Sequence, residues 1–137
     1  MSRLLGLILC TGALAACAPV EREGRADPAL AGPAVTTLGE AENCINRTRI
    51  RSSRVRSDQV IDFEMNGGKV FRNVLTNRCP RLGFEESFSY STSIDQLCNT
   101  DIIYVLDQTG GGLPRRGAGC GLGKFVPVEY VEDGEAE

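Results

Sequence analysis

Five arginines occupy ten consecutive positions of the chain: Arg47, Arg49, Arg51, Arg54 and Arg56. A guanidinium is planar and always charged, and its N–H groups suit bidentate contacts with phosphate or carboxylate. The first three recur at every second position, so in a β-strand they would share one face. The pattern predicts an anion-binding stripe that could hold lipopolysaccharide phosphates, phospholipid headgroups or the carboxylates of peptidoglycan peptides.

The same stripe can also be interpreted as the solvated face of a sheet. Asp62 and Glu64 alternate along the strand expected next, where they could pair with the arginines. Opposite charges paired across strands stabilise a sheet by roughly 0.2–1 kcal/mol. Both interpretations stay open from the sequence, and the second is favoured.

Four cysteines are expected to form two disulfides. Their spacings of 35, 19 and 22 residues contain no Cys-x-x-Cys pair, although such pairs dominate structural zinc sites. An even number of cysteines in an exported domain favours disulfides, and we expect no metal and no cofactor. The four are those that remain after Cys10 and Cys17 are assigned to the export signal: Cys44, Cys79, Cys98 and Cys120.

The sequence lacks the residues that most common catalytic mechanisms require. There is no histidine among the 137 residues, which excludes a Ser-His-Asp triad and a Cys-His dyad. Hydrolysis by Asp and Glu side chains remains an alternative, but no pair of carboxylates can be located from spacing. The glycine-rich stretch 110–123 precedes a strand rather than a helix, so it is interpreted as a hairpin loop and not a phosphate loop. We expect a binding protein rather than an enzyme.

Charge argues against one class of partner. The formal net charge is −3 and the isoelectric point is about 5.1, whereas nucleic-acid binding requires a basic surplus. No nucleic-acid partner is therefore expected.

The first 16 residues have the features of an export signal. Arg3 precedes an apolar run over residues 4–9, which is too short to span a bilayer as a helix of about 20 residues. A conventional signal cut at an Ala-x-Ala site is one interpretation. However, Leu14-Ala15-Ala16-Cys17 resembles the lipobox of bacterial lipoproteins. This resemblance implies a diacylglycerol on Cys17, and Ala18 implies passage to the periplasmic face of the outer membrane.

The mature chain is expected to have three parts. Residues 17–42 are rich in Ala, Pro, Gly and charge, which predicts a flexible tether behind the lipidated cysteine. Residues 43–131 are expected to form one disulfide-stapled domain, and the acidic residues 132–137 a solvated tail.

The domain is predicted to be all-β, a small antiparallel six-stranded sheet or barrel. Asn66-Gly67-Gly68 has hairpin-turn chemistry, and Ile61, Phe63 and Met65 alternate toward a core. The apolar run at 102–106, bounded by Asp101 and Asp107, suits a strand buried on both faces, with a short core helix as the alternative. Residues 109–117 suit a loop. Pro127 is expected to place the end of the last strand at an edge. The strands are expected over residues 44–56, 60–65, 69–75, 84–90, 101–107 and 122–128.

Topology suggests how the cysteines pair. In a simple up-and-down meander, Cys44 and Cys98 precede the first and fifth strands and lie at one end of the sheet. Cys79 and Cys120 lie at the other end. This arrangement favours 44–98 and 79–120 among the three pairings, provided that no strand crosses over.

A series of short motifs also runs through the domain in a fixed order. They resemble a family of small proteobacterial lipoproteins defined as a domain of unknown function, over about residues 44–128. The resemblance implies a location and a fold type, but no binding or catalytic residues. The motifs are Cys44-Ile45, Arg72-Asn73-x-Leu75, Cys79-Pro80-x-Leu82, Phe88-x-Tyr90, Leu97-Cys98, Asp101-x-Ile103 and Cys120-x-Leu122-Gly123-x-Phe125.

Together these features predict a monomeric, lipid-anchored module that binds an envelope protein, lipopolysaccharide or peptidoglycan. The alternative is an inhibitor of an envelope-directed hydrolase such as lysozyme. Lipoprotein inhibitors of lysozyme are disulfide-stapled β-barrels of similar size, but their Ser-Gly-x-x-Tyr loop is absent from this sequence.

Overall fold

The computed structural model describes residues 27–132, and in this range the chain forms ten strands, one short α-helix and two 3-10 turns. The all-β prediction is confirmed, but the number of strands was expected to be six. The signal at 1–16, Cys17, the first part of the tether and the tail from 133 onward lie outside the described residues. The strands are β1 (Val35–Thr37), β2 (Cys44–Asn46), β3 (Ile50–Val55), β4 (Val60–Met65), β5 (Val70–Val74), β6 (Phe88–Tyr90), β7 (Gln96–Cys98), β8 (Ile102–Asp107), β9 (Arg115–Gly121) and β10 (Phe125–Tyr130); the helices are α1 (Leu82–Glu85), η1 (Pro28–Leu30) and η2 (Arg47–Arg49).

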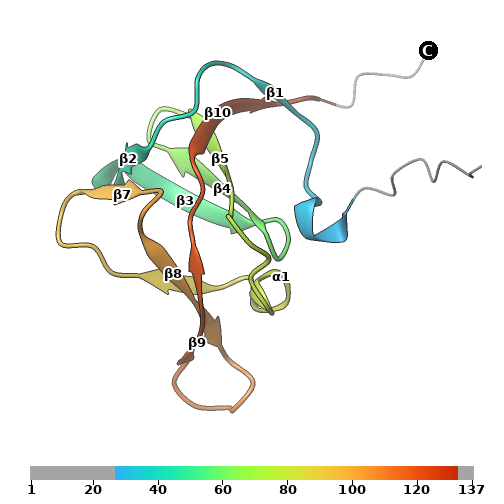
Figure 1. Ribbon diagram of the computed structural model, residues 1–137, viewed down its shortest axis with the longest axis vertical. Helices are drawn as coiled ribbons and strands as arrows, with labels where there is room; N and C mark the ends of the chain where they lie inside the picture. The colour runs from blue at the N-terminus through green and yellow to red at the C-terminus, as the bar shows by residue number, and fades with distance from the viewer. Residues whose placement is uncertain (1–26, 133–137) are drawn as a thin grey trace, which may run out of the picture.

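The strands pair into three antiparallel sheets (Figure 1). The largest has the order β1-β10-β5-β4-β3, a second pairs β2 with β7, and the third has the order β6-β8-β9. Each sheet has two ends and none closes on itself, so the barrel alternative is wrong. The connection between β8 and β9 projects away from the rest of the molecule, at the bottom of Figure 1.

Side chains from all three sheets fill one core. Ile61, Phe63 and Met65 of β4 face it as their alternation predicted. The Phe63 ring makes edge contacts with Phe88 of β6 and Phe125 of β10, at centroid distances of 6.3 and 5.6 Å. Such edge-to-face pairs add to the free energy gained from burying apolar area. The large sheet is thereby packed against the β6-β8-β9 sheet.

The hairpin of β4 and β5 agrees with the prediction. Gly67 and Gly68 in its turn have φ values of 96° and 88°, a region that side chains with a Cβ rarely enter. The two strands pair in register, with Phe63 opposite Phe71. This hairpin forms the middle of the large sheet.

Both expected disulfides are present, although the topology that suggested them is wrong. Cys44 and Cys98 face each other directly in the β2–β7 pair, with their Cα atoms 4.0 Å apart. Cys79 and Cys120 join the segment after β5 to β9, at a Cα–Cα distance of 5.7 Å. The chain is no simple meander, because β10 returns to pair with β5. The pairing was therefore predicted correctly from a topology that the chain does not have.

Residues 84–90 do not form the single strand that was expected. Leu82 is fully buried and anchors α1, whereas Phe84 is 75% exposed. The turn is held by Asp58, whose carboxylate accepts a hydrogen bond from the Gly83 N–H at 2.9 Å. This contact joins positions far apart in the chain, so no local sequence pattern predicts it.

Between residues 27 and 132, no helix has both the length and the apolar character needed to cross a membrane.

Part of the expected tether belongs to the large sheet. Strand β1 pairs with β10, and Glu42 forms an isolated bridge with Phe125 (Figure 1). The folded unit therefore begins before residue 43.

Strand β10 is an interior strand, so the expectation that Pro127 marks an edge is wrong. The Pro127 carbonyl accepts a hydrogen bond from Leu38 N–H at 2.8 Å, so Pro127 N points to the same side, toward β1. Because β1 ends at Thr37, the position at which Pro127 lacks a backbone N–H lies at the end of the hydrogen-bond ladder between β1 and β10. The ladder to β5 on the other side stays intact.

The β8–β9 region differs from expectation in two respects. Ile103 and Val105 of β8 are buried but Ile102 is exposed, so the strand is not buried on both faces. Strand β9 begins at Arg115, inside the stretch expected to be a loop. The connecting loop is thus confined to residues 108–114.

Candidate functional site

The five arginines do not share one strand face. Arg47 and Arg49 belong to the 3-10 turn η2, and β3 begins only at Ile50. The Asn46 side chain causes this break, because its carbonyl oxygen accepts hydrogen bonds from Thr48 N–H at 2.9 Å and Thr48 O–H at 2.7 Å. A cap of this kind offers the backbone a turn in place of a strand. The prediction that Arg47, Arg49 and Arg51 share one face of a strand is wrong.

Three of the arginines form ion pairs. Arg47 pairs with Asp95 at 3.2 Å, and Arg51 pairs with Glu64 at 3.3 Å. Arg56 pairs with Asp62 at 2.8 Å. The second and third pairs are those that the solvated-face interpretation foresaw.

Asp62, however, is buried rather than solvated, with 2% of its surface exposed. Arg72 donates to both carboxylate oxygens at 2.8 and 3.0 Å, and Arg56 and Tyr130 donate at 2.8 and 3.0 Å. Arg72 also donates to the Pro33 carbonyl at 2.9 Å, which ties the segment before β1 to the sheet. Burial alone would raise the pKa of the Asp62 carboxyl, but the hydrogen bonds and charges of its partners hold that pKa below its ordinary value.

Arg49 and Arg54 behave differently from the other three. Within residues 27–132, neither guanidinium has an ion pair or a side-chain hydrogen bond. Arg54 lies opposite Asp62 in the β3–β4 register and lines a pocket of about 250 Å³ that is also lined by the acidic residues Asp62 and Glu64. Arg49 instead lines a pocket between two sheets.

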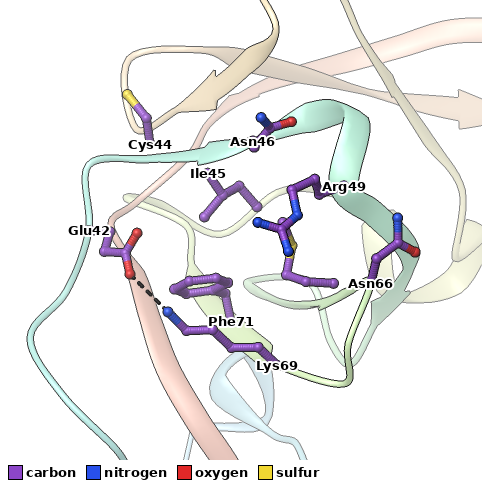
Figure 2. A pocket seen from close by; sticks show the side chains of 9 residues that line it. Glu42, Cys44, Ile45, Asn46, Arg49, Asn66, Lys69 and Phe71 are labelled. Atoms are coloured by element: carbon purple, nitrogen blue, oxygen red, sulfur yellow. Dashed lines mark hydrogen bonds and ion pairs between the residues drawn. The ribbon is translucent and has the colours of Figure 1, made fainter.

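This pocket, which we call the Arg49 pocket, has a volume of about 230 Å³. Figure 2 shows the Arg49 guanidinium directed into it, facing Phe71 and the ion pair between Glu42 and Lys69. One wall comes from β2 and η2, and the other from the β4–β5 hairpin. The pocket is lined by Glu42, Cys44, Ile45, Asn46, Arg49, Met65, Asn66, Lys69 and Phe71.

Backbone contacts fix the position of Arg49. Its carbonyl accepts a hydrogen bond from Asn66 N–H in the hairpin turn at 2.8 Å. The β2 strand before it is held by the buried Ile45 and by the Cys44–Cys98 disulfide. The backbone that carries the Arg49 side chain is therefore held from both walls of the pocket.

The pocket combines charge with an apolar floor. Ile45, Met65 and Phe71 are buried core residues that also face the pocket. Lys69 lies over the Phe71 ring at 4.3 Å and pairs with Glu42 at 3.1 Å. Apolar walls exclude water and strengthen the electrostatic contacts of the charged groups beside them.

Of the residues singled out from the sequence for anion binding, the structure places only Arg49 in this pocket. Glu42 was assigned to the tether, and Lys69 and Phe71 were treated only as strand residues. The hairpin predicted over residues 60–75 places Lys69 next to Met65, on either side of the turn. In agreement, the Lys69 carbonyl accepts a hydrogen bond from Met65 N–H at 2.8 Å. Nothing in the local sequence brings Glu42 to them, because its bridge to Phe125 spans most of the domain.

In comparisons with known proteins, no family model, curated protein or solved structure matches the chain. In the part of the chain that the structure describes, no group of three His, Cys, Asp or Glu side chains is arranged to hold a metal ion.

Proposed function

We propose that the chain is a lipid-anchored binding module of the bacterial envelope, attached through Cys17 to the periplasmic face of the outer membrane. Its Arg49 pocket takes an anionic group of an envelope component. The observation that carries this proposal is a guanidinium directed into an apolar-floored pocket without an acidic partner among residues 27–132. Arg47, Arg51 and Arg56 already have carboxylate partners within the fold and need no ligand.

Size narrows the class of ligand. A pocket of about 230 Å³ is smaller than the ~300–1,000 Å³ typical of sites for drug-sized molecules. It suits one residue or headgroup of a larger polymer rather than a whole chain. Carboxylates of peptidoglycan peptides and phosphates of lipopolysaccharide share the chemistry that Arg49 would recognise.

The pocket is tested by calorimetric titration of the purified lipidated protein with soluble peptidoglycan fragments and, separately, with lipopolysaccharide micelles. Arg49→Gln is expected to weaken binding of the true ligand roughly tenfold or more, because a hydrogen bond to a charged group is lost. Arg51→Gln, which changes an exposed arginine outside the pocket, is the matched control and should bind like wild type. Equal binding by wild type and Arg49→Gln would refute the proposal.

The anchor is tested separately by labelling cells with a fatty-acid analogue. Wild type should incorporate the label and Cys17→Ser should not. Equal labelling of the two would remove the lipid anchor from the proposal without affecting the pocket.

One observation favours inhibition of a hydrolase as a second candidate. The loop between β8 and β9 projects from the molecule (Figure 1), and Leu113 in it is 91% exposed. A protruding apolar side chain could enter a substrate cleft. Inhibition of lysozyme by wild type, lost in Leu113→Ser, would support this candidate, and no inhibition would refute it for that hydrolase.

A further inference from the structure

The Arg49 pocket presents charges of both signs. Glu42 and Arg49 lie on opposite sides of it (Figure 2), with Lys69 beside Glu42. A site for a simple anion would require only the positive side chains. The position of Glu42 therefore bears on what kind of ligand fits, provided that the pocket is the binding site proposed above.

Glu42 keeps acceptor capacity for a ligand. Lys69 donates a hydrogen bond to the Oε1 atom of Glu42 at 3.1 Å, and Oε2 accepts no hydrogen bond from the described side chains. The side chains of Glu42 and Lys69 are 46% and 52% exposed, and ion pairs this exposed are weak. A ligand ammonium can thus join or replace Lys69 at this carboxylate, because little free energy is lost with the Glu42–Lys69 ion pair.

The floor of the pocket suits a short aliphatic chain. Ile45 and Phe71 lie between the two charged sides (Figure 2), and Met65 also lines the pocket. Methylene groups placed on these side chains would leave water. Lys69 already lays its own side chain over the Phe71 ring. The ring face is therefore suited both to methylenes and to a cation.

We propose that the pocket holds the zwitterionic end of an amino-acid side chain. The carboxylate of that end is held by Arg49, its ammonium by Glu42, and the aliphatic arm lies on Phe71. Diamino dicarboxylic acid residues of peptidoglycan stem peptides that are not cross-linked offer such an end, on an arm of a few methylenes. This inference rests on the proposed function and specifies its ligand.

The test uses three tripeptides and the purified lipidated protein. The first is L-Ala-γ-D-Glu-meso-diaminopimelate, which carries the free zwitterionic end. The second is the same tripeptide acetylated on the side-chain amine, which keeps only the carboxylate. The third is L-Ala-γ-D-Glu-L-Lys, which keeps only the ammonium. Wild type is expected to bind the first roughly tenfold or more tightly than either of the others, because each of them loses one charged contact.

Glu42→Gln provides the decisive variant. It removes the partner of the ligand ammonium and also releases Lys69, so it should bind the acetylated tripeptide more tightly than wild type does. Its preference for the first tripeptide over the second should vanish. Glu40→Gln, an exposed change on the same segment and outside the pocket lining, is the control and should keep the wild-type preference. Thermal melting of each variant shows whether it is folded.

The outcomes separate this inference from the proposed function. If wild type binds the first two tripeptides equally and Arg49→Gln weakens both, the anion site stands and the zwitterion inference is wrong. If no tripeptide binds but lipopolysaccharide binds through Arg49, the inference is also wrong and the function stands. If Glu42→Gln keeps the wild-type preference, the inference is overturned. If Arg49→Gln changes none of the affinities, both are overturned.

Discussion

At the scale of single residues, Asp62 is the most consequential polar group of the large sheet. Two arginines and a tyrosine donate to its buried carboxylate. Asp62→Asn would leave Arg56 and Arg72 facing a neutral amide in a site with little water. Removing one partner of a buried ion pair costs about 3–5 kcal/mol, so the free energy of unfolding at pH 7 should fall by that amount. Urea unfolding of wild type and Asp62→Asn measures it.

The pH dependence of stability provides the control for this prediction. Because the pKa of Asp62 is lower in the folded than in the unfolded chain, its contribution is present above the unfolded value of about 3.9 and is lost as pH falls through the folded value. The difference between wild type and Asp62→Asn should therefore shrink below pH 4. Glu64→Gln, which affects a more exposed pair, should cost about 1 kcal/mol or less. A difference that stays constant with pH would contradict this account.

At the scale of elements, the β4–β5 turn positions Asn66 and Lys69 at the Arg49 pocket. A Cβ on Gly67 or Gly68 would meet no atom within 4 Å, so any cost of adding one comes from the backbone. A residue with a Cβ in the left-handed region costs about 1–2 kcal/mol, and Gly67→Ala and Gly68→Ala should each lower the free energy of unfolding by that amount. Gly110→Ala is the matched control, since it also lies in open space but lacks a positive φ. An equal loss in all three variants would show that the turn conformation is not responsible.

Elements with strong local signals could be predicted from the sequence, and those held by distant partners could not. The alternation around Phe63 and the Asn-Gly-Gly turn are local, and they indicated β4 and β5 correctly. Strand β1 has only three residues and exists because β10 offers it an edge. In the same way, α1 depends on the carboxylate of Asp58.

The candidate site shows the same division. A run of arginines is visible in the sequence, but which of them lack an ion-pair partner depends on the fold. Asn46 turns the chain so that Arg49 faces the β4–β5 hairpin, while Arg51 and Arg56 reach carboxylates on β4. The pocket is assembled from segments on either side of β3. Of its lining residues, only Arg49 could therefore be proposed as an anion-binding residue from the sequence.

At the scale of the whole molecule, the two disulfides fasten different parts of the fold. Cys44–Cys98 holds the small β2–β7 sheet, whose strand β2 forms a wall of the Arg49 pocket. Cys79–Cys120 links the chain before α1 to β9 and has its Cys79 end in the core. Replacing either pair by alanine should lower the free energy of unfolding by roughly 2–5 kcal/mol.

Local opening should distinguish the two disulfides, even though removing either one is expected to lower the free energy of unfolding by a similar amount. Without Cys44–Cys98, amide hydrogens of β2 and η2 should exchange faster than in wild type, while those of α1 and β9 should stay protected until global unfolding. Without Cys79–Cys120 the pattern should reverse, because α1 is a single turn whose other contacts, such as the Asp58 hydrogen bond and the burial of Leu82, are not covalent. Native-state hydrogen exchange by NMR on both alanine pairs measures this. Uniformly faster exchange throughout the domain in both variants would mean that the three sheets open as one cooperative unit and that the wall of the Arg49 pocket has no stability of its own.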